Sequence, residues 1–216
     1  MDKEIRHHLT DGLLMGYAAG NLPEAFNLVV ATHISMCDEC RAALAEYEAV
    51  GGELLAAEMA CEMAEDSLEA TLARIRAGAP EEPRRAAVAG GIFPGPLKDY
   101  LNGDETAVKW RRIGGGVSQM VIPTGGKETV RLLKIPAGTA VPDHGHGGTE
   151  LTLVLQGAYA DDHDRFGAGD IEVAGEDLEH TPVAETGADC ICLIATDAPL
   201  RFNRFMPRIA QRIFRI

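Results

Sequence analysis

The stretch that decides the fold class covers residues 138–157 and reads GTAVPDHGHGGTELTLVLQG. In it His144 and His146 are followed by Glu150, and all three positions have the same parity. Because alternate residues of a strand share one face, one extended segment or a short hairpin can direct these side chains inward. A neighbouring strand would add His180 as a fourth ligand, and these ligand types admit Zn, Mn, Fe or Ni. One such histidine alone indicates a surface or core imidazole, whereas the set at this spacing predicts a metal site.

After Pro96 the chain alternates short apolar segments with turns rich in Gly and Pro. Many short strands with regular turn signals predict a β-sandwich or barrel. The predicted strands cover residues 117–122, 129–135, 150–155, 171–173 and 189–195.

The first third of the chain has the periodicity of helices instead, with apolar residues three and four positions apart. Asn21 as a cap, then a proline and an acidic residue, mark a strong helix start. The predicted helices begin at Asp11 as a cap, at Asn21, at Cys37 and at residue 53, and the last ends near residue 76. Residues 79–96 are rich in Gly, Pro and charge and predict a linker. The predicted organisation is thus a helical domain over 1–78, this linker, and a barrel over 97–216.

A second candidate metal site lies in the helical third, where His33 is followed by Cys37 and Cys40. A histidine at one helix end and two cysteines at the next helix start can close around one ion, and the helix dipole favours thiolates there. Tetrahedral zinc needs a fourth ligand. We favour His8 over His7 for that place, because one helical hairpin returns the chain from His8 to the site. The alternatives are a redox pair, which lacks a preceding strand here, and buried small apolar cysteines.

Composition and charge restrict the class of function. The chain has 216 residues, a net charge of −13 and no apolar run of membrane-spanning length. Residues 1–80 contain 14 acidic and 5 basic residues, which argues against direct nucleic-acid binding because phosphate contacts need Lys and Arg. These acids either suit a basic protein partner or only solvate helix surfaces. The N-terminus has no apolar signal core, and close-spaced cysteines suit a reducing compartment, so we expect a cytoplasmic protein.

Two further features allow a functional and a structural interpretation. Cys190 and Cys192 share a face of a predicted strand. They are either an oxidisable pair near the barrel metal or small core residues, and we favour the core interpretation. The C-terminal tail is basic. One interpretation is a strip that binds nucleic acid, but we favour docking of the tail on the acidic helices or on the barrel. Its arginines are Arg201, Arg204, Arg208, Arg212 and Arg215.

The helical third resembles the zinc-binding anti-sigma domain, a small helical bundle whose signature is a histidine followed by His-x3-Cys-x2-Cys. The matching residues are His8, His33, Cys37 and Cys40. The resemblance implies that these residues bind zinc. It also implies that the domain clamps an extracytoplasmic-function sigma factor and keeps it from core RNA polymerase.

Residues 138–157 match the first motif of the cupins, which are double-stranded β-helix (jelly-roll) barrels, at every fixed position. The second cupin motif is degraded, although Gly169 and His180 match it. The departures are Gly175, Asp177 and Ala184, which stand where the family has Pro, Gly and Asn. The resemblance therefore supports metal binding more than catalysis.

Together the two halves resemble the ChrR-type zinc anti-sigma factors over nearly the whole chain. The resemblance implies inhibition of a sigma factor that drives the response to singlet oxygen. In such proteins the helical domain suffices for inhibition, and the cupin-like domain is needed for release. The alternative is a metal-dependent cupin dioxygenase or isomerase with a helical dimerisation domain.

Overall fold

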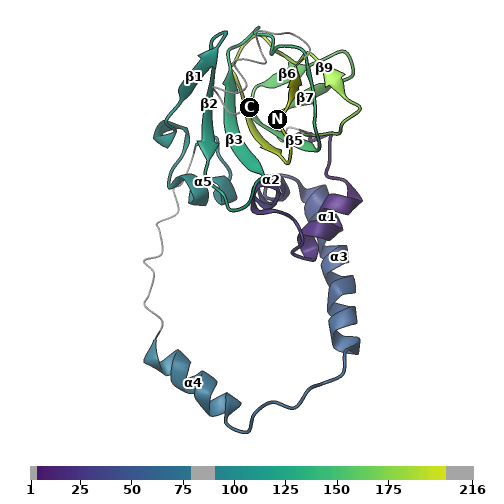
Figure 1. Cartoon of the computed structure of the whole chain (residues 1–216), viewed down its shortest axis with the longest axis vertical. Coiled ribbons are helices and arrows are strands. Elements are labelled where there is room, and N and C mark those ends of the chain that lie inside the picture. The colour runs from purple at the N-terminus through teal and green to yellow at the C-terminus, as the bar shows by residue number, and fades with distance from the viewer. Residues whose placement is uncertain (1–3, 79–90, 203–216) are drawn as a thin grey trace.

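The computed structural model describes residues 4–78 and 91–202 as helices followed by a β-rich barrel (Figure 1). The helices are α1 (Asp11–Ala18), α2 (Glu24–Ile34), α3 (Asp38–Ala57), α4 (Ser67–Ala77), α5 (Gly95–Leu101) and the 3-10 turn η1 (Glu105–Ala107). The strands are β1 (Arg111–Gly114), β2 (Val117–Ile122), β3 (Thr129–Ile135), β4 (His144–Gly145), β5 (Glu150–Gln156), β6 (Ala158–Ala160), β7 (Arg165–Gly167), β8 (Ile171–Ala174), β9 (Glu179–His180), β10 (Val183–Ala184), β11 (Cys190–Thr196) and β12 (Arg201–Phe202). This order confirms the predicted fold class. Most of the predicted linker and the basic tail after Phe202 lie outside the described residues.

The first two helices begin differently from the prediction. Thr10 caps α1, because its hydroxyl oxygen accepts a hydrogen bond from the Leu13 amide, and the predicted cap at Asp11 is wrong. Asp11 instead lies in the first turn, where its charge faces the positive end of the helix dipole. The predicted cap at Asn21 is also wrong. Pro23 takes the extended conformation that precedes α2, and no side chain caps that helix.

Cys37 caps α3 as predicted, and its Sγ lies 3.4 Å from the Cys40 amide that donates to it. The predicted single helix over 53–76 is wrong. The chain continues α3 through Ala57, leaves the helical conformation over 58–66, and begins α4 at Ser67. None of the α4 side chains is buried. Helical propensity alone does not stabilise a long helix when no apolar face is buried. The apolar period over 53–76 therefore did not produce one continuous helix.

The main sheet has six antiparallel strands in the order β1-β2-β3-β11-β5-β8. Its centre is β11, which pairs along its whole length with β3 and also pairs with β5. Two three-stranded sheets, β10-β6-β7 and β12-β4-β9, complete the barrel. The register of the last sheet places His144 directly opposite His180. Strand pairing therefore brings together two histidines that are far apart in the sequence.

Both faces of the main sheet are buried at its central strands, and they belong to different cores. One face shares a core with the helices, through residues such as Leu132, Leu153 and Leu193 from the strands and Phe26, Val29 and Val30 from α2. The other face packs inside the barrel, with Val154, Cys192 and Ile194 near Tyr159 and Phe166. All seven residues of β11 are buried as a result, which explains its uninterrupted apolar sequence.

Helix α2 is the element that joins the helical part to the barrel. It contacts β11, β5, β3 and α5, and Figure 1 shows it at the end of the sheet beside α5. The hydroxyl of Tyr100 on α5 donates to Glu24 at the start of α2, at 2.7 Å. Over residues 4–78 and 91–202, no helix combines the length and apolarity needed to cross a membrane.

Candidate metal centres

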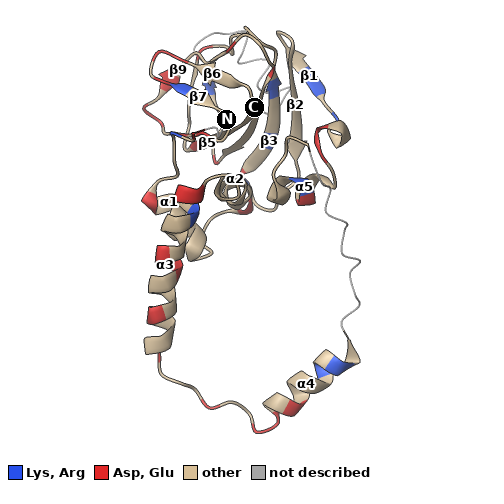
Figure 2. Cartoon of the chain, turned by 180° about the vertical axis from the view of Figure 1, so that it is seen from behind, with Lys and Arg blue, Asp and Glu red and all other residues tan. Residues whose placement is uncertain are grey.

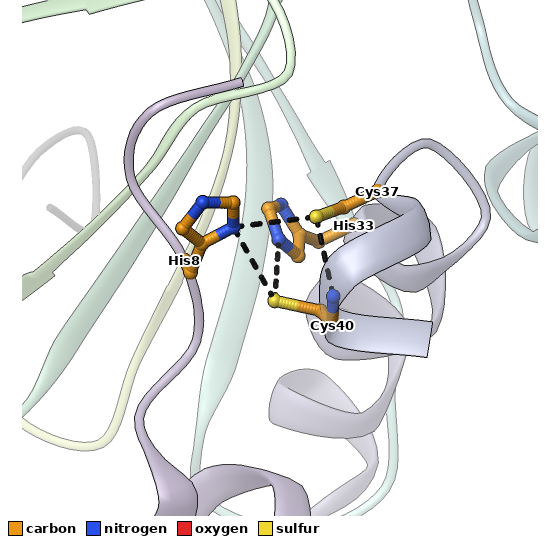
Figure 3. A group of neighbouring side chains, drawn as sticks. All are labelled: His8, His33, Cys37 and Cys40. Atoms are coloured by element: carbon orange, nitrogen blue, oxygen red, sulfur yellow. Dashed lines mark hydrogen bonds between the residues drawn. The ribbon is translucent and has the colours of Figure 1, made fainter. Parts of the chain in front are cut away.

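The helical part brings four ligand-type side chains together from three elements (Figure 3). His8 precedes α1, His33 lies in the last turn of α2, and Cys37 and Cys40 lie at the start of α3. The Nδ1 of His8 is 3.3 Å from the Sγ of Cys37 and 3.7 Å from that of Cys40. The Nε2 of His33 is 3.3 Å from the Sγ of Cys40. The structure thus groups all four residues selected from the sequence, with ligand atoms within 4.8 Å of one another.

The spacing of these atoms fits a tetrahedral zinc ion. Zinc bonds of roughly 2.0–2.3 Å place tetrahedral ligand atoms roughly 3.3–3.8 Å apart. The sulfur–nitrogen distances of 3.3 and 3.7 Å fall in that range. Two imidazoles and two thiols are also a recurrent ligand set of structural zinc.

Burial acts in opposite directions on the two kinds of ligand in this cluster. The side chain of His33 is fully buried, and burial lowers its pKa to about 4, so the ring is neutral at pH 7 with a free lone pair. Burial raises the pKa of Cys40 to about 11 in the metal-free protein. The thiol must therefore lose its proton as the metal binds, and metal affinity rises with pH.

The two adjacent N-terminal histidines have different partners. The Nε2 of His8 is 3.3 Å from the Oε2 of Glu39, an arrangement that leaves Nδ1 facing the cysteines. The Nε2 of His7 is 3.0 Å from the Oδ2 of Asp164, and its ring lies 4.4 Å from the Phe166 ring. The histidine of the cluster is therefore His8, while His7 contacts the barrel.

The barrel contains a second cluster, formed by His144, His146 and His180. Their ring centroids are 4.8–5.3 Å apart. Among the described residues, neither ring nitrogen of His146 nor the Nε2 of His180 has a hydrogen-bond partner, although these atoms are buried. Unpartnered buried nitrogens are costly, and a divalent ion between the rings would remove that cost. Burial lowers the pKa of His144 and His146 to about 4, so both rings are neutral ligands at pH 7.

Hydrogen bonds at Nδ1 orient two of these rings. The Nδ1 of His144 lies 2.9 Å from the carbonyl oxygen of Pro142. The Nδ1 of His180 lies 2.7 Å from Asp161 Oδ2 and 3.5 Å from Glu172 Oε1. A ring that donates from Nδ1 presents its lone pair at Nε2, toward the cluster. Sequence analysis missed Asp161 and Glu172, because one lies in the turn between β6 and β7 and the other on β8, and neither has a characteristic spacing from the histidines.

Glu150, which was predicted to bind the metal together with His144, His146 and His180, borders the three imidazoles. Its Oε2 is 3.9 Å from the Nδ1 of His146, and it is not part of the group whose ligand atoms lie within 4.8 Å. The Thr152 hydroxyl donates to its other oxygen at 3.2 Å. Burial raises the pKa of Glu150 to about 7, against the lowering effect of the Arg131 charge. A cation bound at the imidazoles would favour the carboxylate form.

A cavity of about 540 Å³ lies beside the barrel cluster. Its polar lining includes Arg131, His144, Glu150, Thr152, Tyr159, Glu172 and His180, and most of the remaining lining is apolar. The cavity gives the barrel site room for a small molecule next to the imidazoles.

Cys190 and Cys192 lie on the inner face of β11, in the barrel core, as expected for small core residues. Their sulfurs are 3.6 Å apart. The adjacent Cys190 and burial together raise the pKa of Cys192 well above its usual value. Cys192 also lines the cavity, so it faces the barrel site.

Comparison with known proteins agrees with this architecture. Residues 101–199 match the family model of the ChrR cupin-like domain. The chain is 57% identical over 212 residues to the anti-sigma-E factor ChrR of Cereibacter sphaeroides, which covers 98% of this chain and 99% of that protein. A crystal structure of Rhodobacter sphaeroides SigE in complex with the anti-sigma ChrR matches with a TM-score of 0.79 and 55% identity, over 90% of this chain and 100% of that chain.

The fold and the two clusters define a helical, thiol-containing unit packed on a cupin-like barrel. At this level of identity over nearly the full length, the chain belongs to the ChrR family of anti-sigma factors.

Proposed function

We propose that this protein binds an extracytoplasmic-function sigma factor, keeps it from core RNA polymerase, and releases it under singlet oxygen or related oxidative stress. The observation that supports the proposal best is the full-length likeness to a ChrR solved in complex with SigE. The protein acts as a regulatory binding protein in the cytoplasm, without direct contact to nucleic acid. Its proposed units are the helical domain over 1–78, a linker over 79–96 and a cupin-like barrel over 97–216.

The surface proposed to bind the sigma factor runs along the end of α3, the following segment and α4. Large apolar side chains are exposed there without a partner in the described chain: Val50, Leu54, Leu55, Met59, Met63, Leu68, Leu72 and Ile75. A contiguous set of exposed apolar residues is typical of a protein–protein contact. Acidic residues lie along α3, as Figure 2 shows, and suit a basic partner surface. We call this set the α3–α4 apolar surface.

The two clusters have different proposed roles. Zn²⁺ bound by His8, His33, Cys37 and Cys40 holds α2 and α3 in the orientation that presents the α3–α4 apolar surface. His144, His146, Glu150 and His180 bind Zn²⁺, or Fe, Mn or Ni, in the barrel that senses the oxidant. The thiols of Cys190 and Cys192 lie beside that site.

Co-purification from native cytoplasm tests the sigma-factor proposal. We expect the full chain to retain one sigma factor, His33→Ala to lose it, and the double substitution Leu68→Asp/Leu72→Asp to lose it as well. The double substitution Ala70→Asp/Ala73→Asp is the matched control, because it adds the same two charges to the opposite face of α4. Absence of any sigma factor with the intact protein, or its retention by His33→Ala, contradicts the proposal.

An enzyme is the second candidate, favoured by the cavity next to three imidazoles. A cupin dioxygenase or isomerase would hold a metal there with an open position. Metal analysis with an oxygen electrode separates the candidates. Stoichiometric iron with oxygen consumption favours the enzyme, and two zinc ions without turnover favour the regulator.

A further inference from the structure

The turn between β6 and β7, residues 161–164, contacts the barrel cluster directly and, on its other side, His7, the residue next to the His8 of the N-terminal cluster. At its first residue, Asp161 Oδ2 lies 2.7 Å from the Nδ1 of His180 in the barrel cluster. At its last residue, Asp164 Oδ2 lies 3.0 Å from the Nε2 of His7. His7 precedes His8, whose Nδ1 is 3.3 Å from the Sγ of Cys37. A short series of direct contacts therefore connects the two clusters.

The turn itself is held as one unit by internal hydrogen bonds. The Oδ1 of Asp161 accepts from the amides of His163 and Asp164, at 2.8 and 2.9 Å. The Asp161 amide donates to the Asp164 carbonyl at 3.0 Å. The side chain of Asp161 is fully buried. Because one carboxylate binds both the His180 ring and the turn amides, a displacement of that ring also displaces Asp164.

The N-terminal segment is held against the barrel on its other side too. Asp170, which is buried, accepts hydrogen bonds from the amides of Arg6 and His7 at 2.6 and 3.1 Å. The Ile171 amide donates to the His7 carbonyl at 3.3 Å. The His7 ring packs on Phe166. The position of the main chain at His8 is therefore set by the barrel and not by the helices alone.

We propose that residues 161–164 and His7 couple the two metal centres, so that the state of the barrel cluster controls how firmly the N-terminal cluster holds zinc. Displacement of the His180 ring, by loss of its metal or by oxidation in the barrel, breaks the Asp161 contact and moves Asp164. The His7 ring then loses its Asp164 contact and keeps only those to Asp170 and Phe166, so the His8 ligand next to it is held less firmly. The coupling deepens the proposed function, because it gives the barrel a route to the sigma-binding helices.

The test measures protection of the N-terminal thiols in the full-length protein reconstituted with Zn²⁺. The protein is challenged with a chelator and an alkylating reagent, and mass spectrometry follows modification of Cys37 and Cys40. The exposed Cys61 in the same molecule serves as the internal reference. This readout does not involve a sigma factor, so its result is independent of whether the proposed partner is correct.

A double-mutant cycle provides the decisive comparison. His180→Ala should speed alkylation of the two thiols by roughly two- to tenfold, the effect of losing about one hydrogen bond. In an Asp164→Asn background His180→Ala should no longer speed alkylation. A His7→Gln background, which removes the other partner of the Asp164 contact, should abolish the acceleration as well. Asp162→Asn, in the same turn but exposed, is the control and should leave the effect of His180→Ala unchanged.

Two results overturn the coupling. One is that His180→Ala changes thiol protection equally with and without Asp164→Asn, which would mean that the effect travels elsewhere. The other is that His180→Ala changes nothing in either background. Circular dichroism of each variant establishes that the fold is intact, and if His180→Ala fails to fold, Asp161→Asn replaces it in the cycle, because it weakens the same contact from the other side.

Discussion

The two clusters of this molecule are built in contrasting ways. The N-terminal cluster lies within residues 8–40, and local helix geometry places its two sulfurs at the start of α3. The barrel cluster is assembled from β4, the residue after it and β9, and a cavity of about 540 Å³ lies beside it. A four-ligand set with sulfur is typical of a structural ion, whereas a site of imidazoles and a carboxylate beside a cavity can be reached by another molecule. The contrast supports the proposed division of roles, in which one ion would stabilise the helical unit and the other would lie where a signal molecule can reach it.

The carboxylates next to the two clusters also differ, in how far their side chains are exposed to solvent. Glu39, beside His8, has a side chain that is 76% exposed. Asp161, beside His180, has a side chain that is 0% exposed. A buried charged acceptor orients a ligand more strongly than one that competes with water. The barrel cluster should therefore depend on its neighbours more than the N-terminal cluster does.

The largest expected effect is on the N-terminal cluster, from Cys40→Ala. We expect loss of one zinc ion per chain and a fall of roughly 3 kcal/mol or more in the free energy of unfolding, because structural zinc contributes directly to folding. Thermal unfolding with zinc analysis measures both. The control is Cys61→Ala, an exposed cysteine, which should change stability by less than about 0.5 kcal/mol. An unchanged melting temperature for Cys40→Ala would contradict a structural role for this site.

The next effect is the pH dependence of the metal-free protein. His33, His144 and His146 have pKa values of about 4 in the fold against 6.5 normally. The unfolded chain therefore binds more protons between these values, and stability should fall as pH falls from about 6.5 to about 4, by on the order of 1–3 kcal/mol per imidazole. Chemical denaturation of the chelated protein across this range measures the slope.

Glu150 acts in the opposite direction and provides the control. Its pKa is about 7 in the fold against 4.5 normally, so its contribution to stability decreases as pH rises through that interval. We expect Glu150→Gln to steepen the rise of stability with pH between about 4.5 and 7. A chelated protein whose stability is flat or decreases with pH from 4 to 6.5 would show that the imidazoles are not buried in neutral form.

A smaller effect should follow from Asp161→Asn, which keeps the shape of the side chain but removes its charge. Asn is a weaker acceptor for the His180 ring, and we expect roughly tenfold weaker metal binding at the barrel cluster. Competition with a chromophoric chelator measures the affinity. Asp162→Asn should bind metal as the unchanged protein does, and equal affinities for all three proteins would remove Asp161 from the site.

The smallest effect should come from Glu39→Gln at the N-terminal cluster. Because Glu39 is exposed to solvent, we expect zinc affinity to change by less than about threefold. The same chelator competition measures it. A loss as large as that expected for Asp161→Asn would abolish the proposed difference between the exposed and buried carboxylates.

Sequence reasoning succeeded where the relevant geometry is local. The start of a helix at Cys37 follows from apolar spacing and the strand over 117–122 from an apolar stretch between turn signals, and both are confirmed. It failed at Asp11, Asn21 and the segment 53–76, where a neighbouring hydroxyl, the main chain at a proline and the absence of burial decided the outcome. In each case several residues satisfy the same local rule, and the packing selects among them.

The amino-acid order by itself determined which side chains can bind metal and which periodicity each segment has, since ligand chemistry and local spacing need no partner. The tertiary structure alone decided that β4 pairs with β9, that α2 shares a core with the main sheet, and that Asp161 and His7 lie between the two clusters. The physical reason is that such contacts join residues whose separation along the chain exceeds any local period. Their stability comes from burial and hydrogen bonds that form only when the barrel closes.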